Sequence, residues 1–255
     1  MRVAVVGATG AIGARTVAAL RAGGHETVPI ARSLGIDVRD GRGLAAALDG
    51  VDVVVDVTSS NATDRAETTA FFEAVTSNLL ASERDCGVRH HVALSIVGVD
   101  RVEGNAHYAG KRRQEALVSD GDVPWTIQRA TQFFDFPAMV ADWTTVDAVA
   151  TLPPLLLQPV SSDDVAARLA EIASGQSALG LAPDFAGPDT HDLVDMARRT
   201  LLVRGDERTI RASWRNQPFS LEMAGEVLLP GPGAVIAPTT FDEWLAAGAP
   251  ADATH

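Results

Sequence analysis

Three glycines lie three residues apart near the start of the chain, in the segment Val5-Val6-Gly7-Ala8-Thr9-Gly10-Ala11-Ile12-Gly13. Between a strand and a helix, such glycines allow a tight turn, a close approach of backbone amides to a pyrophosphate, and close helix packing on the sheet. The spacing G-x-x-G-x-x-G differs from the standard G-x-G-x-x-G, but the position before an amphipathic helix is the context that the motif requires. We therefore predict that a dinucleotide is bound by Gly7, Thr9, Gly10, Ala11, Ile12 and Gly13; the alternative is a turn that binds nothing.

The end of the second expected strand indicates which dinucleotide this turn would bind. It reads Pro29-Ile30-Ala31-Arg32-Ser33 and contains no acidic residue. An acidic side chain at this point binds the ribose 2′-OH of NAD, whereas an arginine accepts the 2′-phosphate of NADP through charge-assisted hydrogen bonds. Arg32 therefore favours NADP(H) over NAD(H), and the alternative is a solvated arginine without a ligand.

The elements that must position these residues follow from the alternation of short β-branched runs with longer Ala- and Leu-rich stretches. Strands are expected at residues 2–6, 26–31, 51–57, 88–95 and 124–130, and helices at 11–21, 43–48, 64–86 and 106–119. Near-continuous apolar strands separated by crossover helices are typical of a parallel sheet buried on both faces. The predicted fold class is therefore α/β, a doubly wound parallel sheet of the Rossmann type.

The second half of the chain is less regular. It contains one expected strand at 155–160 and helices at 163–173, 192–203 and 241–247, joined by Pro- and Gly-rich loops. We expect residues 1–150 to form the nucleotide-binding core and residues 151–255 a smaller C-terminal substrate lobe contiguous with it. Five apolar residues just after the fifth strand would form either a substrate wall or core packing: Phe133, Phe134, Phe136, Met139 and Trp143.

Composition and charge exclude several classes of protein. Hydrophobic residues make up 46% of the chain and charged residues 21%, which excludes a disordered chain. A net charge of -12 does not suit binding to nucleic acid or to an anionic membrane, and no apolar stretch is long enough for a signal peptide or a spanning helix. The single cysteine, Cys86, forms no usual zinc pattern with His90 and His91. We predict a cytoplasmic protein with a small-molecule substrate and without a nucleic-acid, membrane or metal partner.

Several longer segments resemble a known family. They are Asp37-Val38-Arg39-Asp40, Ser95-Ile96-Val97-Gly98-Val99-Asp100, Pro124-Trp125-Thr126-Ile127-Gln128-Arg129-Ala130-Thr131-Gln132-Phe133, Gln158-Pro159-Val160 with Asp164-Val165-Ala166, and Phe241-Asp242-Glu243-Trp244-Leu245. Together with the glycine spacing, these segments resemble the atypical short-chain dehydrogenases, and within them the NmrA-like NAD(P)-binding proteins of the epimerase/dehydratase type. The resemblance spans nearly the whole chain, but only the nucleotide half has motifs with a clear chemical meaning.

The resemblance implies further cofactor-binding residues. Asp37 and the backbone of Val38 would line the adenine pocket, and Thr58 and Ser59, at the end of the third strand, would lie near the ribose and the pyrophosphate. The local alternatives are turn formation by Asp37 and helix capping by Ser59.

The catalytic pattern of the family is only partly matched. Short-chain dehydrogenases generally pair a tyrosine with a lysine four residues later, but here His107 lies four residues before Lys111 and Tyr108 three residues before it. Both spacings place the side chains on one helical face, so either residue could serve as the proton donor beside Lys111. The resemblance implies that Ser95 hydrogen-bonds the substrate oxygen. A tyrosine starts at a pKa of about 10 and needs positive charge to approach neutrality, whereas a histidine needs little tuning.

These observations predict an NADPH-dependent oxidoreductase that acts on a small carbonyl or quinone-like substrate. Two alternatives remain open. Whatever the chemistry, we expect Lys111 to bind the nicotinamide ribose of the cofactor. The displaced tyrosine would suit a catalytically silent NADP(H)-binding redox sensor, in which Lys111 has no further role. The family resemblance would also suit an epimerase, dehydratase or isomerase with bound NAD(P).

Overall fold

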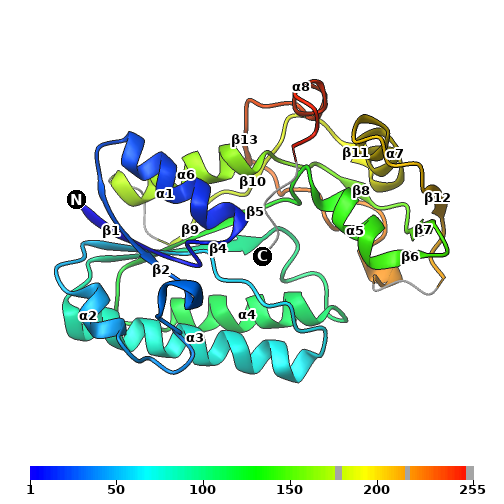
Figure 1. Ribbon diagram of the computed structural model, residues 1–255. Coiled ribbons are helices and arrows are strands. Elements are labelled where there is room, and N and C mark those ends of the chain that lie inside the picture. Colours follow the sequence, from blue (N-terminus) through cyan, green and yellow to red (C-terminus); the bar gives the residue numbers. More distant parts are fainter. Residues whose placement is uncertain (176–179, 216–218, 251–255) are drawn as a thin grey trace.

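A computed structural model describes residues 1–175, 180–215 and 219–250, and it is organised around one parallel sheet (Figure 1). The sheet has eight strands in the order β13-β10-β5-β4-β3-β1-β2, with β9 paired to β5. The strands are β1 (Arg2–Val6), β2 (Glu26–Ile30), β3 (Val53–Asp56), β4 (His90–Ile96), β5 (Trp125–Ala130), β9 (Gly180–Leu181), β10 (Phe185–Ala186) and β13 (Val235–Ile236). The predicted doubly wound parallel sheet is thus confirmed.

Helices cover both faces of this sheet (Figure 1). One face carries α1 (Ala11–Ala22) and α6 (Ser162–Ser174), and the other carries α2 (Leu44–Leu48), α3 (Arg65–Cys86) and α4 (Ala106–Ser119). Each face buries its own cluster of Val, Ile and Leu side chains against these helices. A short 3-10 helix, η1 (Arg32–Leu34), follows β2. None of the helices in the described residues is long and apolar enough to cross a membrane.

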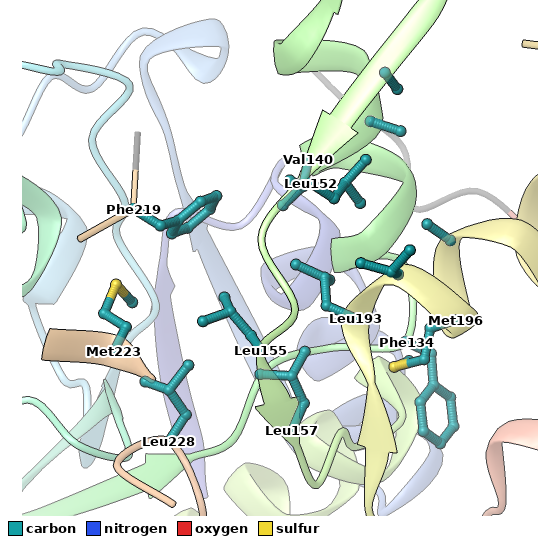
Figure 2. Close-up of a cluster of buried hydrophobic side chains, with 14 of the residues drawn as sticks. Phe134, Val140, Leu152, Leu155, Leu157, Leu193, Met196, Phe219, Met223 and Leu228 are labelled. Atoms are coloured by element: carbon teal, nitrogen blue, oxygen red, sulfur yellow. The ribbon is translucent and has the colours of Figure 1, made fainter. Parts of the chain in front are cut away.

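The remaining elements form a C-terminal lobe beside the carboxyl end of the sheet (Figure 1). They are α5 (Phe136–Thr144), β6 (Thr145–Val146), β7 (Val149–Leu152), β8 (Leu156–Leu157), β11 (His191–Asp192), α7 (Leu193–Val203), β12 (Thr209–Ala212), η2 (Leu221–Met223) and α8 (Phe241–Ala246). Strands β12, β7 and β6 make a small sheet, and β11 pairs with β8. Figure 2 shows the apolar core of this lobe. Tyr108, from the start of α4, belongs to the same cluster of buried residues.

Most of the predicted elements lie within one or two residues of their observed bounds, but the region after β5 differs. Helix α5 was not predicted, and the strand expected at 155–160 is reduced to β8 and an isolated bridge between Phe133 and Val160. Of the five apolar residues for which a substrate wall or core packing was expected, Phe134 is buried in the core of the lobe, whereas Trp143 is 59% exposed on α5. The expected division of the chain at residue 150 stays a prediction. Beyond this residue, α6 packs on the main sheet, and β9, β10 and β13 are strands of it.

Candidate functional site

The glycine-rich segment forms a closed turn between β1 and α1. Gly7 has a φ of +83°, which favours glycine, and its amide donates to the carbonyl of Ile30 at the end of β2 at 3.0 Å. The amide of Gly10 donates back to the carbonyl of Gly7 at 3.0 Å. These bonds hold the turn against the carboxyl ends of two adjacent parallel strands, where nucleotides bind in open α/β sheets.

Gly13 explains why α1 can begin so close to this turn. A Cβ atom on Gly13 would lie 2.7 Å from the carbonyl carbon of Gly7 and 2.8 Å from the Cα of Ala8, so any larger residue would push the turn away. Gly7 lies close to the next loop, because a Cβ there would lie 3.1 Å from the carbonyl oxygen of Val57. The glycines therefore allow three backbone segments to meet.

The start of α1 is suited to an anion. Its N-cap residue is Gly10, no side chain in the described residues caps the helix, and its first turn contains no acidic residue. The first backbone N–H groups of a helix have no partner within it, and the helix dipole places a partial positive charge there. An uncapped start above a glycine turn fits a pyrophosphate.

Arg32 lies directly beside this turn. It opens η1 after β2 and is exposed. The neighbouring Ser33 hydroxyl donates to Thr9 Oγ1 at 3.3 Å, which links η1 to the glycine turn. Arg32 is thus available for a ligand phosphate at the position expected from the sequence.

Asp37 and Val38 follow η1. The Asp37 carboxylate accepts bonds from the backbone N–H and the guanidinium of Arg39, and Arg39 holds the pKa of Asp37 below its usual value. This is the local turn role expected as an alternative. Val38 is buried, and its carbonyl accepts from Asn78 Nδ2 at 2.9 Å. Their contact with adenine stays a prediction.

Lys111 is the only lysine of the chain, and it is buried. Its Nζ donates to the carbonyls of Thr58 at 3.1 Å and Leu94 at 2.9 Å, and to Gln114 Oε1 at 2.9 Å. Lys111 therefore joins the carboxyl ends of β3 and β4. Burial lowers the pKa of the amine to about 8, although nearby Asp56 and Glu115 favour its charged form.

His107 and Tyr108 point into different surroundings. His107 packs edge-on against Phe72 of α3, with ring centroids 5.8 Å apart, and the ammonium of Lys111 lies 4.8 Å from the centroid of the same ring. Burial and the positive charge of Lys111 lower the pKa of His107 to about 4, so the imidazole is neutral at pH 7.

Tyr108 belongs to the core of the C-terminal lobe, where its hydroxyl accepts a hydrogen bond from Gln132 Nε2 at 3.3 Å. Burial raises the pKa of this hydroxyl well above its usual value. The phenol therefore remains protonated over the whole neutral range.

Unpartnered polar atoms gather at the carboxyl ends of three neighbouring strands. Among the described residues, no hydrogen-bond partner exists for the buried atoms Thr58 Oγ1, Ser95 Oγ, Thr131 Oγ1 and Gln132 Oε1, which follow or end β3, β4 and β5. Buried polar groups in proteins nearly always have a partner. These atoms and the uncapped start of α1 therefore fit a polar ligand such as a nicotinamide dinucleotide at this edge of the sheet.

Two further residues of the site were missed by the sequence analysis. Asp56 is fully buried at the end of β3, and Gln114 is buried on α4, one turn after Lys111. Gln114 Nε2 donates to Asp56 Oδ2 at 2.8 Å. An available signal was the aspartate itself, because a charged residue at the end of an apolar run that is expected to be buried needs a partner. Ser59, by contrast, is exposed, and the helix cap expected from it is provided by Asp64.

Comparisons with solved structures support the observed fold. The NADPH-dependent quinone oxidoreductase QOR2 from Escherichia coli, complexed with NADPH, is 20% identical, with a TM-score of 0.63 over 83% of this chain and 78% of that one. A short-chain dehydrogenase/reductase superfamily protein from Agrobacterium tumefaciens with bound NAD is 17% identical, with a TM-score of 0.69 over 98% and 96%. UDP-N-acetylglucosamine 4-epimerase from Bacillus cereus is 15% identical, with a TM-score of 0.66 over 84% and 85%. At these identities the likeness concerns the fold.

The family is established by the sequence itself. No curated protein matches the chain. Residues 29–175 match the model of the NAD(P)H-binding family. The match begins within β2, after the glycine turn and α1, and includes Arg32, Lys111 and the missed pair Asp56 and Gln114. The match spans more than half of the chain and agrees with the predicted resemblance to atypical short-chain dehydrogenases. The chain therefore belongs to the NAD(P)H-binding family.

Proposed function

We propose that the protein is an NADPH-dependent oxidoreductase that reduces a small carbonyl or quinone-like substrate. The observation that carries this proposal is the closed turn from Gly7 to Gly13 with exposed Arg32 beside it. When bound, the nicotinamide supplies a hydride. The similarity of the fold to an NADPH-dependent quinone oxidoreductase supports the same choice of chemistry.

The cofactor side of the proposal follows from charge and geometry. The first turn of α1 binds the pyrophosphate through the free N–H groups of Ala11, Ile12 and Gly13, with Thr9 and Gly10 beside it. Arg32 pairs with the 2′-phosphate of the adenosine. Thr58 and Ser59 contact the ribose side. Lys111 donates its three N–H groups to protein acceptors, so it holds the backbone of this site in place.

On the substrate side, Tyr108 and Ser95 bind the oxygen that becomes a hydroxyl. Tyr108 accepts a hydrogen bond from Gln132, so its own proton is free to be donated elsewhere. An alkoxide is a stronger base than even a phenolate of raised pKa, so the proton moves from Tyr108 to the substrate oxygen. His107 is a poorer donor because its imidazole is neutral at pH 7.

One observation favours a second candidate, an NADP(H)-binding sensor without turnover. The pKa values of Tyr108 and His107 are both shifted away from the neutral range in which an acid catalyst works best. Turnover therefore decides between the two candidates.

Cofactor titrations test the first half of the proposal. We expect NADPH to bind more tightly than NADH, and Arg32→Ala to weaken NADPH binding by about tenfold or more while leaving NADH binding unchanged, because only the 2′-phosphate loses a charge-assisted bond. Arg84→Ala is the matched control, since Arg84 is also exposed but lies at the far end of α3. NADH binding as tight as NADPH binding would overturn the preference for NADPH.

Turnover tests the second half. The purified protein is mixed with NADPH and a panel of aldehydes, ketones and quinones, and the loss of NADPH absorbance is followed. Net consumption of NADPH with any member of the panel supports the oxidoreductase. Tight binding without consumption by any of them supports the sensor instead.

A further inference from the structure

The only lysine of the chain is built into the interior and not into an open site. We propose that the side chains of Asp56, Gln114 and Lys111 form a buried hydrogen-bond network that holds the Val57–Thr58 peptide against the glycine turn. The affinity for the cofactor then depends on this network. This inference rests on the proposed function, because it concerns the same cofactor site.

First, all hydrogen-bond donors of the Lys111 ammonium are used within the protein. An ammonium group has three N–H donors. Its three hydrogen bonds, to Thr58 O, Leu94 O and Gln114 Oε1, use all of them, and the residue is only 4% exposed. Lys111 therefore acts on the site through the backbone segments that it joins.

The second step is the path from Lys111 to Asp56. Gln114 accepts from Lys111 through Oε1 and donates to Asp56 Oδ2 through Nε2. The opposite amide orientation would place N–H groups against the ammonium and an oxygen against the carboxylate, so the two charges determine which way the amide points. A glutamine is thus the side chain that can bridge a buried cation and a buried anion.

The third step is the double hold on Thr58. Its backbone N–H donates to Asp56 Oδ1 at 2.9 Å, and its carbonyl accepts from Lys111 at 3.1 Å. The backbone N–H and the carbonyl of Thr58 are therefore both held by the Asp56–Gln114–Lys111 network, one by Asp56 and the other by Lys111.

The fourth step connects this hold to the dinucleotide turn. A Cβ on Gly7 would lie 3.1 Å from Val57 O and 3.4 Å from Thr58 N, so the turn already touches the Val57–Thr58 peptide. A displacement of this peptide must move the turn or leave a gap beside it. Because the cofactor site is formed by backbone groups, a small shift is enough to weaken binding.

The test compares Gln114→Met, which keeps the volume of the side chain but removes both bonds, with Val118→Ala on the same helix. Val118 is fully buried against Ala93 and Ile127, so its truncation destabilises the fold but removes no hydrogen bond of the Asp56–Gln114–Lys111 network. We expect Gln114→Met to weaken NADPH binding by about tenfold or more, and Val118→Ala to bind NADPH as the wild type does. Asp56→Asn provides a second variant in case Gln114→Met folds poorly.

A second readout observes Lys111 directly. Selective 13C-lysine labelling gives a single Cε resonance, because the chain has one lysine. The charged or titratable groups that act on Lys111 are Asp56, Glu115 and His107. Asp56→Asn removes one negative charge, so the titration midpoint of this resonance should fall.

Two results would overturn this inference but leave the proposed function standing. They are an unchanged Cε midpoint in Asp56→Asn, and a loss of NADPH affinity in Gln114→Met no greater than that in Val118→Ala. If the wild type binds neither NADPH nor NADH, the proposed function fails and takes the consequence for the cofactor with it. The titration midpoint of the Lys111 Cε resonance separates these cases, because it is measured without nucleotide and depends on the hydrogen-bond network alone.

Discussion

Replacing Gly13 with alanine tests whether close packing of α1 on the turn creates the cofactor site. The added Cβ would lie 2.7 Å from the carbonyl carbon of Gly7 and 2.8 Å from Ala8 Cα, both of which are backbone atoms that cannot rotate away. In an ordinary helix the same substitution would stabilise the fold by about 1 kcal/mol. Here we expect overpacking, which costs about 1–3 kcal/mol, to dominate at its upper end because the backbone must move.

The net expectation is a loss of about 2 kcal/mol in the free energy of unfolding. In a protein of this size, that loss lowers the melting temperature by about 4–8 °C. The same displacement moves the N–H groups at the start of α1, so NADPH affinity should fall by about tenfold or more. Thermal melting and NADPH titration of the purified variant measure the two effects.

Gly23→Ala is the matched control on the same helix. Gly23 ends α1 with a φ of -76°, and an added Cβ would approach no atom closer than 3.3 Å, the nearest being the movable side chain of His25. This variant should melt and bind NADPH as the wild type does. If Gly13→Ala behaves like Gly23→Ala in both assays, the close-packing explanation of the site is wrong.

Three further predictions concern protons and buried charge. With an active substrate, Tyr108→Phe should lower kcat by about a hundredfold or more, and His107→Ala should leave it within about twofold; the reverse pattern in the steady-state assay would assign the donor to His107. Glu83→Gln removes the charge paired with buried His91 at 2.8 Å and should cost about 3–5 kcal/mol in urea unfolding, while a loss below about 1 kcal/mol would contradict this account. The pKa of Lys111 is lowered from 10.5 to about 8, so the unfolded chain binds the extra proton between these values. Stability relative to Lys111→Met should therefore rise with pH across this range by about 3 kcal/mol, and a flat difference would refute the lowered pKa.

The candidate site divides into parts that the sequence predicts well and parts that it does not. The turn from Gly7 to Gly13 and the position of Arg32 were predictable because they lie within one strand-turn-helix unit, where spacing fixes geometry. Helix α4 was predicted with its observed bounds, and the structure shows a local stabilising feature at its start, where Asn105 caps it by accepting from the N–H of His107.

The pairing of Lys111 was not predictable in the same way. Asp56 and Gln114 lie 58 positions apart in sequence, and only the packing of α4 against the sheet brings their side chains to 2.8 Å. The family pattern suggested a lysine directed to a ligand, whereas the structure directs it to Thr58, Leu94 and Gln114. Helix α5 is short, with Pro137 in its first turn, and its residues were interpreted from the sequence as an apolar cluster after the fifth strand and not as a helix.

The sequence by itself determined the alternation of strands and helices, the parallel sheet and the dinucleotide turn, because these depend on hydrophobic periodicity and on glycines within a few residues of one another. Tertiary structure alone decided the partners of each buried charge, the separation of His107 from Tyr108, and the unpartnered oxygens at the ends of β3, β4 and β5. The physical reason is burial, since the cost of removing a charge from water depends on which distant residues enclose it.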